Sequence, residues 1–134
     1  LVDKDAEVFE PLSRAYGMPK GTEEEKMEKD RVMELCLKDA CSVPMEIMRR
    51  CCEAIELQKG FAEKGSTLAL SDAGVGVAMC RSALLGASLN VFINTKAMKD
   101  REYAEQINRE AEDMLDKYTR LADEIYASVV ERLK

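Results

Sequence analysis

Apolar residues recur at intervals of three and four along most of the chain, which is the spacing of helices that bury one face. No segment alternates apolar and polar residues in the manner of a strand, and no hairpin dipeptide joins two such segments. The sequence therefore predicts an all-α helical bundle of about five helices, with a buried central helix and a long C-terminal helix. The predicted helices cover residues 1–16, 22–43, 44–65, 71–98 and 100–134.

Local signals mark the ends of these helices. A T-x-x-E capping box starts at Thr22, and Asp100 is suited to cap the last helix. Proline lacks a backbone N–H and restricts the residue before it, so Pro11 is expected to bend or end the first helix. For the same reason a helix should end before Pro44, which then starts the next one. A short loop is expected after Gly65.

The opening stretch LVDKDAEVFEPL places its two aspartates differently around the helix axis. The apolar stripe of this helix is predicted to consist of Val2, Ala6, Phe9 and Leu12. Because successive helical residues turn by about 100°, Asp5 falls inside this stripe and Asp3 points to the polar side. An ionised carboxylate on an apolar face is costly unless it is paired. Asp5 is therefore the acidic residue for which a special role is expected.

The segment 71–98 is nearly uncharged and rich in glycine and alanine, so it is predicted to be buried on most sides. Its small side chains allow close helix packing, in the core or across a dimer axis, or leave room for a flat ligand. Asn90 and Asn94 lie four residues apart and project from one face. Buried amides need partners, which are other groups of the bundle or a ligand. Asp72, beside Ser71, is expected to cap this helix, with a role in a site as the alternative.

Length, net charge and hydropathy argue against several classes of binding partner. A length of 134 residues favours one domain, and a net charge of −6 provides no basic surface for nucleic acid or anionic membranes. No run approaches the roughly 18 apolar residues of a membrane span, and no secretory leader is evident, so a soluble, cytoplasmic protein is expected. Arg49, Arg50 and Arg81 are able to receive an anionic ligand, although arginines on a bundle are usually solvated or paired.

The five cysteines do not form paired C-x-x-C knuckles, and the chain contains no histidine. A zinc site would need at least three thiolates from different helices, so no metal is expected. The cysteines are predicted to be reduced and mostly buried.

Five stretches, taken in order over almost the whole chain, are LVDKDAEVF, MPKGTEEEK, ACSVPMEI, SDAGVG and GASLNVFIN. As a set they resemble the formiminotransferase-cyclodeaminase C-terminal domain and its relatives, the bacterial methenyltetrahydrofolate cyclohydrolases. The resemblance implies a dimeric all-α bundle that handles one-carbon units on tetrahydrofolate, with no cofactor beyond the folate-bound substrate. It also implies that the catalytic aspartate is Asp5. Family members have a segment with a PGGGS-type turn upstream, so residues 1–134 are expected to be a single domain that is a fragment of a longer one.

The resemblance leaves two reactions open. In the cyclodeaminase, N10 attacks the formimino carbon and ammonia leaves; in the cyclohydrolase, water attacks the methenyl carbon and the ring opens to the 10-formyl compound. Both need proton transfer near a positive carbon, which suits a carboxylate at Asp5. Asn90, Asn94 and Asp72 are the candidate substrate-binding residues. The alternatives are a non-catalytic helical dimerisation module, with the C-terminal helix as its seam, and a folate-binding relative without catalysis.

Overall fold

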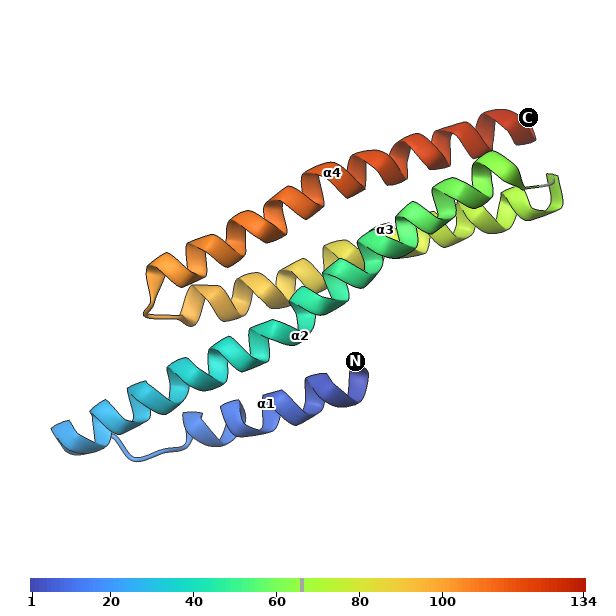
Figure 1. The fold of residues 1–134 in the computed structure, drawn as a ribbon. Helices are drawn as coiled ribbons and strands as arrows, with labels where there is room; N and C mark the ends of the chain where they lie inside the picture. The colour runs from blue at the N-terminus through green and yellow to red at the C-terminus, as the bar shows by residue number, and fades with distance from the viewer. Residues whose placement is uncertain (66) are drawn as a thin grey trace.

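The computed structural model describes residues 1–65 and 67–134, and over these residues the chain forms four α helices and no strand. The helices are α1 (Val2–Tyr16), α2 (Glu23–Lys64), α3 (Thr67–Ala97) and α4 (Arg101–Leu133). Consecutive helices run in opposite directions, and the short α1 lies beside the first half of α2 (Figure 1). The all-α prediction is confirmed, including the long C-terminal helix.

The helix break predicted at Pro44 is absent, so the chain has one helix fewer than expected, whereas the first helix ends at Tyr16 as predicted. Pro44 lies inside α2, and Pro11 lies inside α1. An internal proline costs about 3 kcal/mol in an isolated helix, but Val43 and Met45 on either side of Pro44 are buried and packing holds the helix together. α2 bends near its middle, which is the expected result of the missing N–H and the proline ring (Figure 1).

The predicted N-caps at both capping positions are confirmed. The Thr22 hydroxyl accepts a hydrogen bond from the Glu25 N–H at 3.1 Å, and the Asp100 carboxylate accepts one from the Tyr103 N–H at 3.1 Å. Each bond satisfies one of the amide groups that have no partner in the first turn of a helix.

The start of α3 differs from the prediction. The loop expected after Gly65 is shorter, because α3 already begins at Thr67; Ser66 lies outside the described residues. Asp72 therefore lies in the second turn of α3 and does not occupy the cap position that the sequence suggested.

The hydrophobic core lies between α2, α3 and α4. Its largest fully buried side chains include Met45, Met48, Ile55, Leu70, Leu84 and Val91. Over the described residues, α1 contributes the buried side chains of Leu12 and Ala15 and packs on α2 alone. The core is thus built by three long helices, and α1 is an outer element.

α3 is less buried than the sequence predicted. One face packs into the core, but Met79, Leu89 and Ile93 on the other face are each 68–69% exposed. By length and composition Ala69–Ala97 qualifies as a membrane span, and 28% of its most apolar window is buried. By that criterion, the expectation that no segment is apolar enough to cross a bilayer is wrong.

All five cysteines are free thiols, as predicted. Cys41 and Cys52 are buried, and the other three are half-buried. Burial disfavours the thiolate and raises the pKa of Cys41 and of Cys52 to about 11. These two thiols are therefore suited to packing and not to nucleophilic chemistry.

Candidate functional site

A pocket of about 310 Å³ lies between α1 and α3, with α2 as its floor. It is lined by Asp5, Val8 and Phe9 of α1, Ala40 and Pro44 of α2, and Asn90, Ile93 and Asn94 of α3. Three of the four predicted site residues thus border one pocket, although α1 and α3 are separated by the whole of α2 in the sequence. Asp72, the fourth predicted site residue, does not line this pocket.

Asp5 is exposed, in contrast to the buried position that the sequence predicted. The face of α1 that packs on α2 consists of Val8, Leu12 and Ala15. In the predicted stripe, Val2, Ala6 and Phe9 are exposed. At about 100° per residue, Asp5 projects only about 20° from Leu12, so it continues the α2-facing side of α1 into the pocket.

The two asparagines differ in their surroundings. Asn94 is half-buried, and its side-chain nitrogen donates a hydrogen bond to the backbone oxygen of Asn90 at 2.9 Å. This bond leaves the side-chain oxygen of Asn94 as an acceptor. The Asn90 side chain is exposed and, within the described part of the chain, has no hydrogen-bond partner. The predicted burial is therefore wrong for Asn90, and of the two kinds of partner predicted, a group of the bundle is found for Asn94.

The floor of the pocket contains an unusual backbone group. In a regular helix the carbonyl oxygen of Ala40 would accept a hydrogen bond from the N–H of residue 44, but Pro44 has no N–H. Both residues are buried and both line the pocket. The ACSVPMEI stretch thus leaves a main-chain acceptor without its helical donor below Asp5.

The apolar walls of the pocket were not assigned from the sequence. The sequence pattern predicts Phe9 in the core and predicts no role for Val8 or Ile93. A usable signal was present, because Val8 and Phe9 follow Asp5 by three and four residues and Ile93 follows Asn90 by three. Residues at these spacings share a helix face with the polar residue.

Asp72 lies far from this pocket. It is exposed on α3, and at about 1.5 Å per residue it is about 27 Å from Asn90 along the helix axis. A direct contribution of Asp72 to the pocket of the same chain is therefore excluded.

The three candidate arginines are all paired. Arg49 and Arg50 contact Glu46 at 3.5 and 3.1 Å, and Arg81 contacts Asp123 at 2.8 Å. These contacts favour the structural interpretation of the arginines. None of the three lines the pocket of Asp5.

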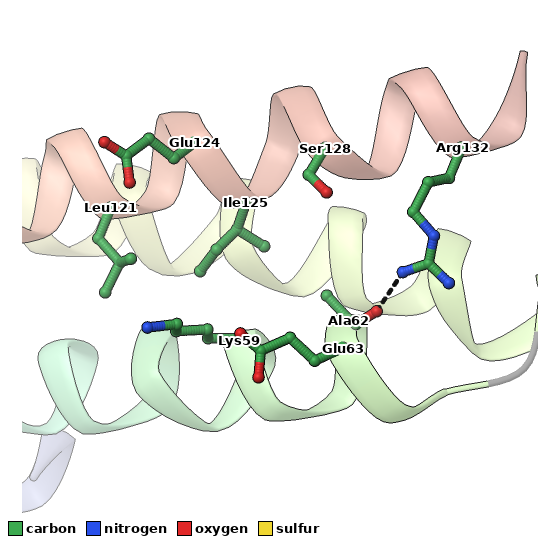
Figure 2. Close-up of a pocket in the computed structure, with 8 residues that line it drawn as sticks. All are labelled: Lys59, Ala62, Glu63, Leu121, Glu124, Ile125, Ser128 and Arg132. Atoms are coloured by element: carbon green, nitrogen blue, oxygen red, sulfur yellow. Dashed lines mark hydrogen bonds between the residues drawn. The ribbon is translucent and has the colours of Figure 1, made fainter.

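A second pocket, of about 200 Å³, lies between the C-terminal halves of α2 and α4 (Figure 2). Its walls include Lys59, Glu63, Glu124 and Arg132, and none of the predicted site residues. Figure 2 shows Arg132 reaching across to the backbone oxygen of Ala62, to which it donates a hydrogen bond. This contact joins the end of α4 to the last turns of α2, which is a structural role.

Comparison with known proteins shows which sequences this chain is similar to. Residues 1–113 match the family described as Formiminotransferase-cyclodeaminase. The chain is 38% identical over 133 residues to the methenyltetrahydrofolate cyclohydrolase of Methylorubrum extorquens, with 99% of this chain and 64% of that protein covered. It is 29% identical over 116 residues to the formimidoyltransferase-cyclodeaminase of Gallus gallus, which covers 87% of this chain and 21% of that protein.

The fold is also similar to a solved structure. The crystal structure of formiminotetrahydrofolate cyclodeaminase from Thermotoga maritima matches with a TM-score of 0.69 and 27% identity, over 97% of this chain and 59% of that one. The chain thus spans about 64% of the cyclohydrolase and 59% of the solved cyclodeaminase. On the match over residues 1–113, this chain belongs to the formiminotransferase-cyclodeaminase family.

Proposed function

We propose that the chain carries the active site of a folate-dependent enzyme acting on a C–N bond at the one-carbon unit held by N5 and N10 of tetrahydrofolate. The observation that carries this proposal is the meeting of Asp5, Asn90 and Asn94 at one pocket. Of the two reactions, hydrolysis of methenyltetrahydrofolate is the first candidate, because the cyclohydrolase relative is 38% identical and the cyclodeaminase relative 29%.

Asp5 is the proton carrier in this proposal. The methenyl carbon belongs to a cationic amidinium group, which a nearby carboxylate stabilises. Water attacks this carbon and gives a proton to Asp5. The bond from the carbon to N5 then breaks, N5 receives one proton and a second proton is released to solvent, which leaves the 10-formyl compound. General acid–base help of this kind typically contributes 10² to 10⁴ in rate.

The other pocket residues would position the folate. The Asn90 amide offers both a donor and an acceptor, Asn94 offers its side-chain oxygen, and the Ala40 carbonyl offers a main-chain acceptor. A pterin ring is flat and carries both donors and acceptors at its edge. Phe9 and Ile93 provide apolar contacts for its faces.

Loss of ammonia from formiminotetrahydrofolate is the second candidate, supported by the fold similarity to a cyclodeaminase. The same carboxylate serves this reaction, because N10 attacks the formimino carbon and the departing ammonia must receive a proton. The pocket therefore suits either substrate.

Offering both folates to the purified protein tests the proposal. Ring opening of methenyltetrahydrofolate is followed by absorbance, and conversion of formiminotetrahydrofolate by ammonia release, each against the uncatalysed rate. Faster conversion of either compound is expected. If neither compound is converted and neither raises the unfolding temperature, the proposal is contradicted and the interaction-module alternative is favoured.

We also propose a cytoplasmic homodimer without nucleic-acid or membrane partners and without a cofactor beyond the folate-bound substrate. The net charge of −6 supports the absence of nucleic-acid binding, because phosphate recognition needs a basic surface. The exposed apolar face of α3 supports self-association.

A further inference from the structure

Pro44 is an internal proline whose position in α2 coincides with the pocket of Asp5. A proline inside a helix removes one backbone hydrogen bond, and its ring clashes with the carbonyl four residues earlier. In α2 that carbonyl belongs to Ala40, which lines the same pocket as Pro44. The clash separates the two turns on the side of the ring, so the helix bends away from that side. The opened side of α2 is therefore the side that faces the pocket.

The carbonyl of Ala40 also lacks a side-chain donor within the described part of the chain. The neighbouring Ser42 hydroxyl donates to the Asp39 oxygen at 2.6 Å, and the Cys41 thiol donates to the Val91 oxygen at 3.8 Å. Ala40 itself is buried. A buried carbonyl without its donor costs free energy unless a water molecule or a ligand supplies one. The floor of the pocket therefore favours a molecule that donates a hydrogen bond.

Asp5 lies at the same level of the bundle as this carbonyl. α1 and α2 are antiparallel (Figure 1), and the Lys29 side chain of α2 donates a hydrogen bond to the Tyr16 backbone oxygen at 2.9 Å. Asp5 lies eleven residues before Tyr16, and Ala40 lies eleven residues after Lys29. Both helices rise by about 1.5 Å per residue, so these equal steps return to one level. The carboxylate and the carbonyl are thus two acceptors at one level of the pocket.

We propose that Pro44 frees the Ala40 carbonyl to hold, together with Asp5, the water molecule that attacks the methenyl carbon. This role rests on the proposed function, because it belongs to the hydrolysis of methenyltetrahydrofolate. A water molecule donates two hydrogen bonds. When Asp5 accepts one and Ala40 accepts the other, the lone pairs of the water oxygen point away from both acceptors and toward the substrate. The Ala40 carbonyl thus has a more specific task than contact with the folate ring.

The two acceptors take different parts in the step. The water oxygen forms a bond to the methenyl carbon while one of its O–H bonds breaks, and that proton passes to the Asp5 carboxylate. The electron pair of the C=N bond moves to the nitrogen and neutralises its charge. The second hydrogen stays on the oxygen, held by Ala40, and is released to solvent when the bond to N5 breaks and the formyl group forms. Pro44 is a positioning residue, because it acts through Ala40.

Replacement of Pro44 tests this role. Pro44→Ala restores the N–H that occupies the Ala40 carbonyl in a regular helix, and Pro44→Val does so while keeping more of the buried volume. In both variants kcat for methenyltetrahydrofolate hydrolysis should fall at least about tenfold, because the water loses one acceptor. The Kd of tetrahydrofolate, measured by calorimetry, should stay within about twofold, because the role concerns the water and not the folate. Helical circular dichroism verifies that each variant is folded.

A chain with L-lactic acid in place of Pro44 separates the effect of the N–H from that of the ring. Lactic acid has the same methyl side chain as alanine but joins the chain through an ester, so it provides no N–H. Its kcat should stay within about threefold of the parent, although the proline ring is missing. Pro11→Ala is the second control, because Pro11 is an exposed internal proline of α1 outside the pocket. Its kcat should equal that of the parent.

Four outcomes overturn the role of the Ala40 carbonyl. The first is an equal loss of kcat in Pro44→Ala and in the lactic acid chain, which would assign the effect to the ring. The second is a higher Kd with unchanged kcat, which would assign the carbonyl to folate binding. The third is a parent that hydrolyses methenyltetrahydrofolate no faster than Pro44→Ala and Pro44→Val. The fourth is a parent that converts formiminotetrahydrofolate alone, since that reaction uses no water as nucleophile.

The parent distinguishes this role from the proposed function. A parent that converts neither folate contradicts the proposed function and this role together. A parent that hydrolyses methenyltetrahydrofolate, with a Pro44→Ala variant that is folded and equally fast, contradicts the water-holding role alone.

Discussion

Asp5 is an exposed carboxylate in the first turn of α1. Its predicted burial in the stripe of α1 is wrong, because Asp5 itself and the stripe residues Val2, Ala6 and Phe9 are exposed. Asp5 nevertheless borders a pocket, since it continues the side of α1 that faces α2. The three-and-four periodicity locates a helix face to within some tens of degrees. A difference of that size decides whether a residue is buried or lies at the edge of a pocket.

Replacement of Asp5 by asparagine should lower turnover by at least about 10² while the protein stays folded. Asp5 is exposed in the first turn of α1, so the free energy of unfolding should fall by no more than about 1 kcal/mol through the lost helix-dipole contact. Asp3→Asn is the matched control, because Asp3 lies in the same turn but outside the pocket. Turnover and urea unfolding are measured on both variants. Full activity in a folded Asp5→Asn protein would refute the assignment.

Cys41 and Cys52 should resist alkylation in the native protein. Burial raises the pKa of each thiol to about 11 from the ordinary value of 9.0, so at pH 8 the thiolate fraction is about a hundredfold lower. Mass spectrometry after brief treatment with iodoacetamide should find both residues unmodified in native protein and modified in urea. Rapid native labelling of Cys41 at pH 8 would contradict this prediction.

At the scale of helices, tertiary packing overrides the helix-ending signal of Pro44 and agrees with the capping signal of Asp100. Pro44 does not end α2, because the buried residues around it hold the helix against the core. The Asp100 cap is formed as predicted, because the geometry of an N-cap depends only on neighbouring residues. The structure adds an ion pair between Asp100 and Lys38 at 3.0 Å, which joins the start of α4 to α2.

Asp100→Ala should lower the free energy of unfolding at pH 7 by more than an exposed substitution inside the helix does, since it removes the cap. Asp113→Ala, at an exposed position inside α4, should change it by less than about 0.5 kcal/mol. The hydrogen bond from Lys38, together with that from the Tyr103 N–H, holds the pKa of Asp100 below its ordinary value of 3.8.

The pH dependence of this effect has a definite sign. Because the pKa of Asp100 is lower in the folded state, its contribution is present above pH 3.8 and is lost as pH falls through the lowered pKa. The difference between the parent and Asp100→Ala in urea unfolding should therefore decrease below about pH 3.8. A difference that stays constant into strong acid would show that the carboxylate is not responsible.

At the scale of the whole molecule, the catalytic candidate lies on the least anchored element. Within residues 1–65 and 67–134, α1 packs only on α2, whereas α2, α3 and α4 all contact one another. Elements with few buried contacts open at lower free energy than the core. The pocket between α1 and α3 thus has one wall that is easily displaced and one that belongs to the core.

Backbone amides of α1 should therefore exchange with deuterium at least about tenfold faster than those of the buried face of α3. A bound folate substrate should slow exchange in α1 selectively, because it contacts Asp5 and Phe9 on one side and α3 on the other. Exchange in the last turns of α4, which lie outside the pocket, is the internal control. Equal exchange in α1 and α3 without ligand would contradict the view of α1 as an outer element.

The sequence by itself determined the helical class, the two N-caps, the free thiols and the family. These depend on periodicity, on hydrogen bonds between near neighbours and on matching stretches of residues, all of which are local along the chain. Only the tertiary structure decided that Pro44 lies inside one long helix, that Asp5 and Asn90 are exposed at a shared pocket, and that Asp72 lies far from it. It also decided which face of α3 is covered, because an almost uniformly apolar helix has no polar face from which its orientation can be predicted.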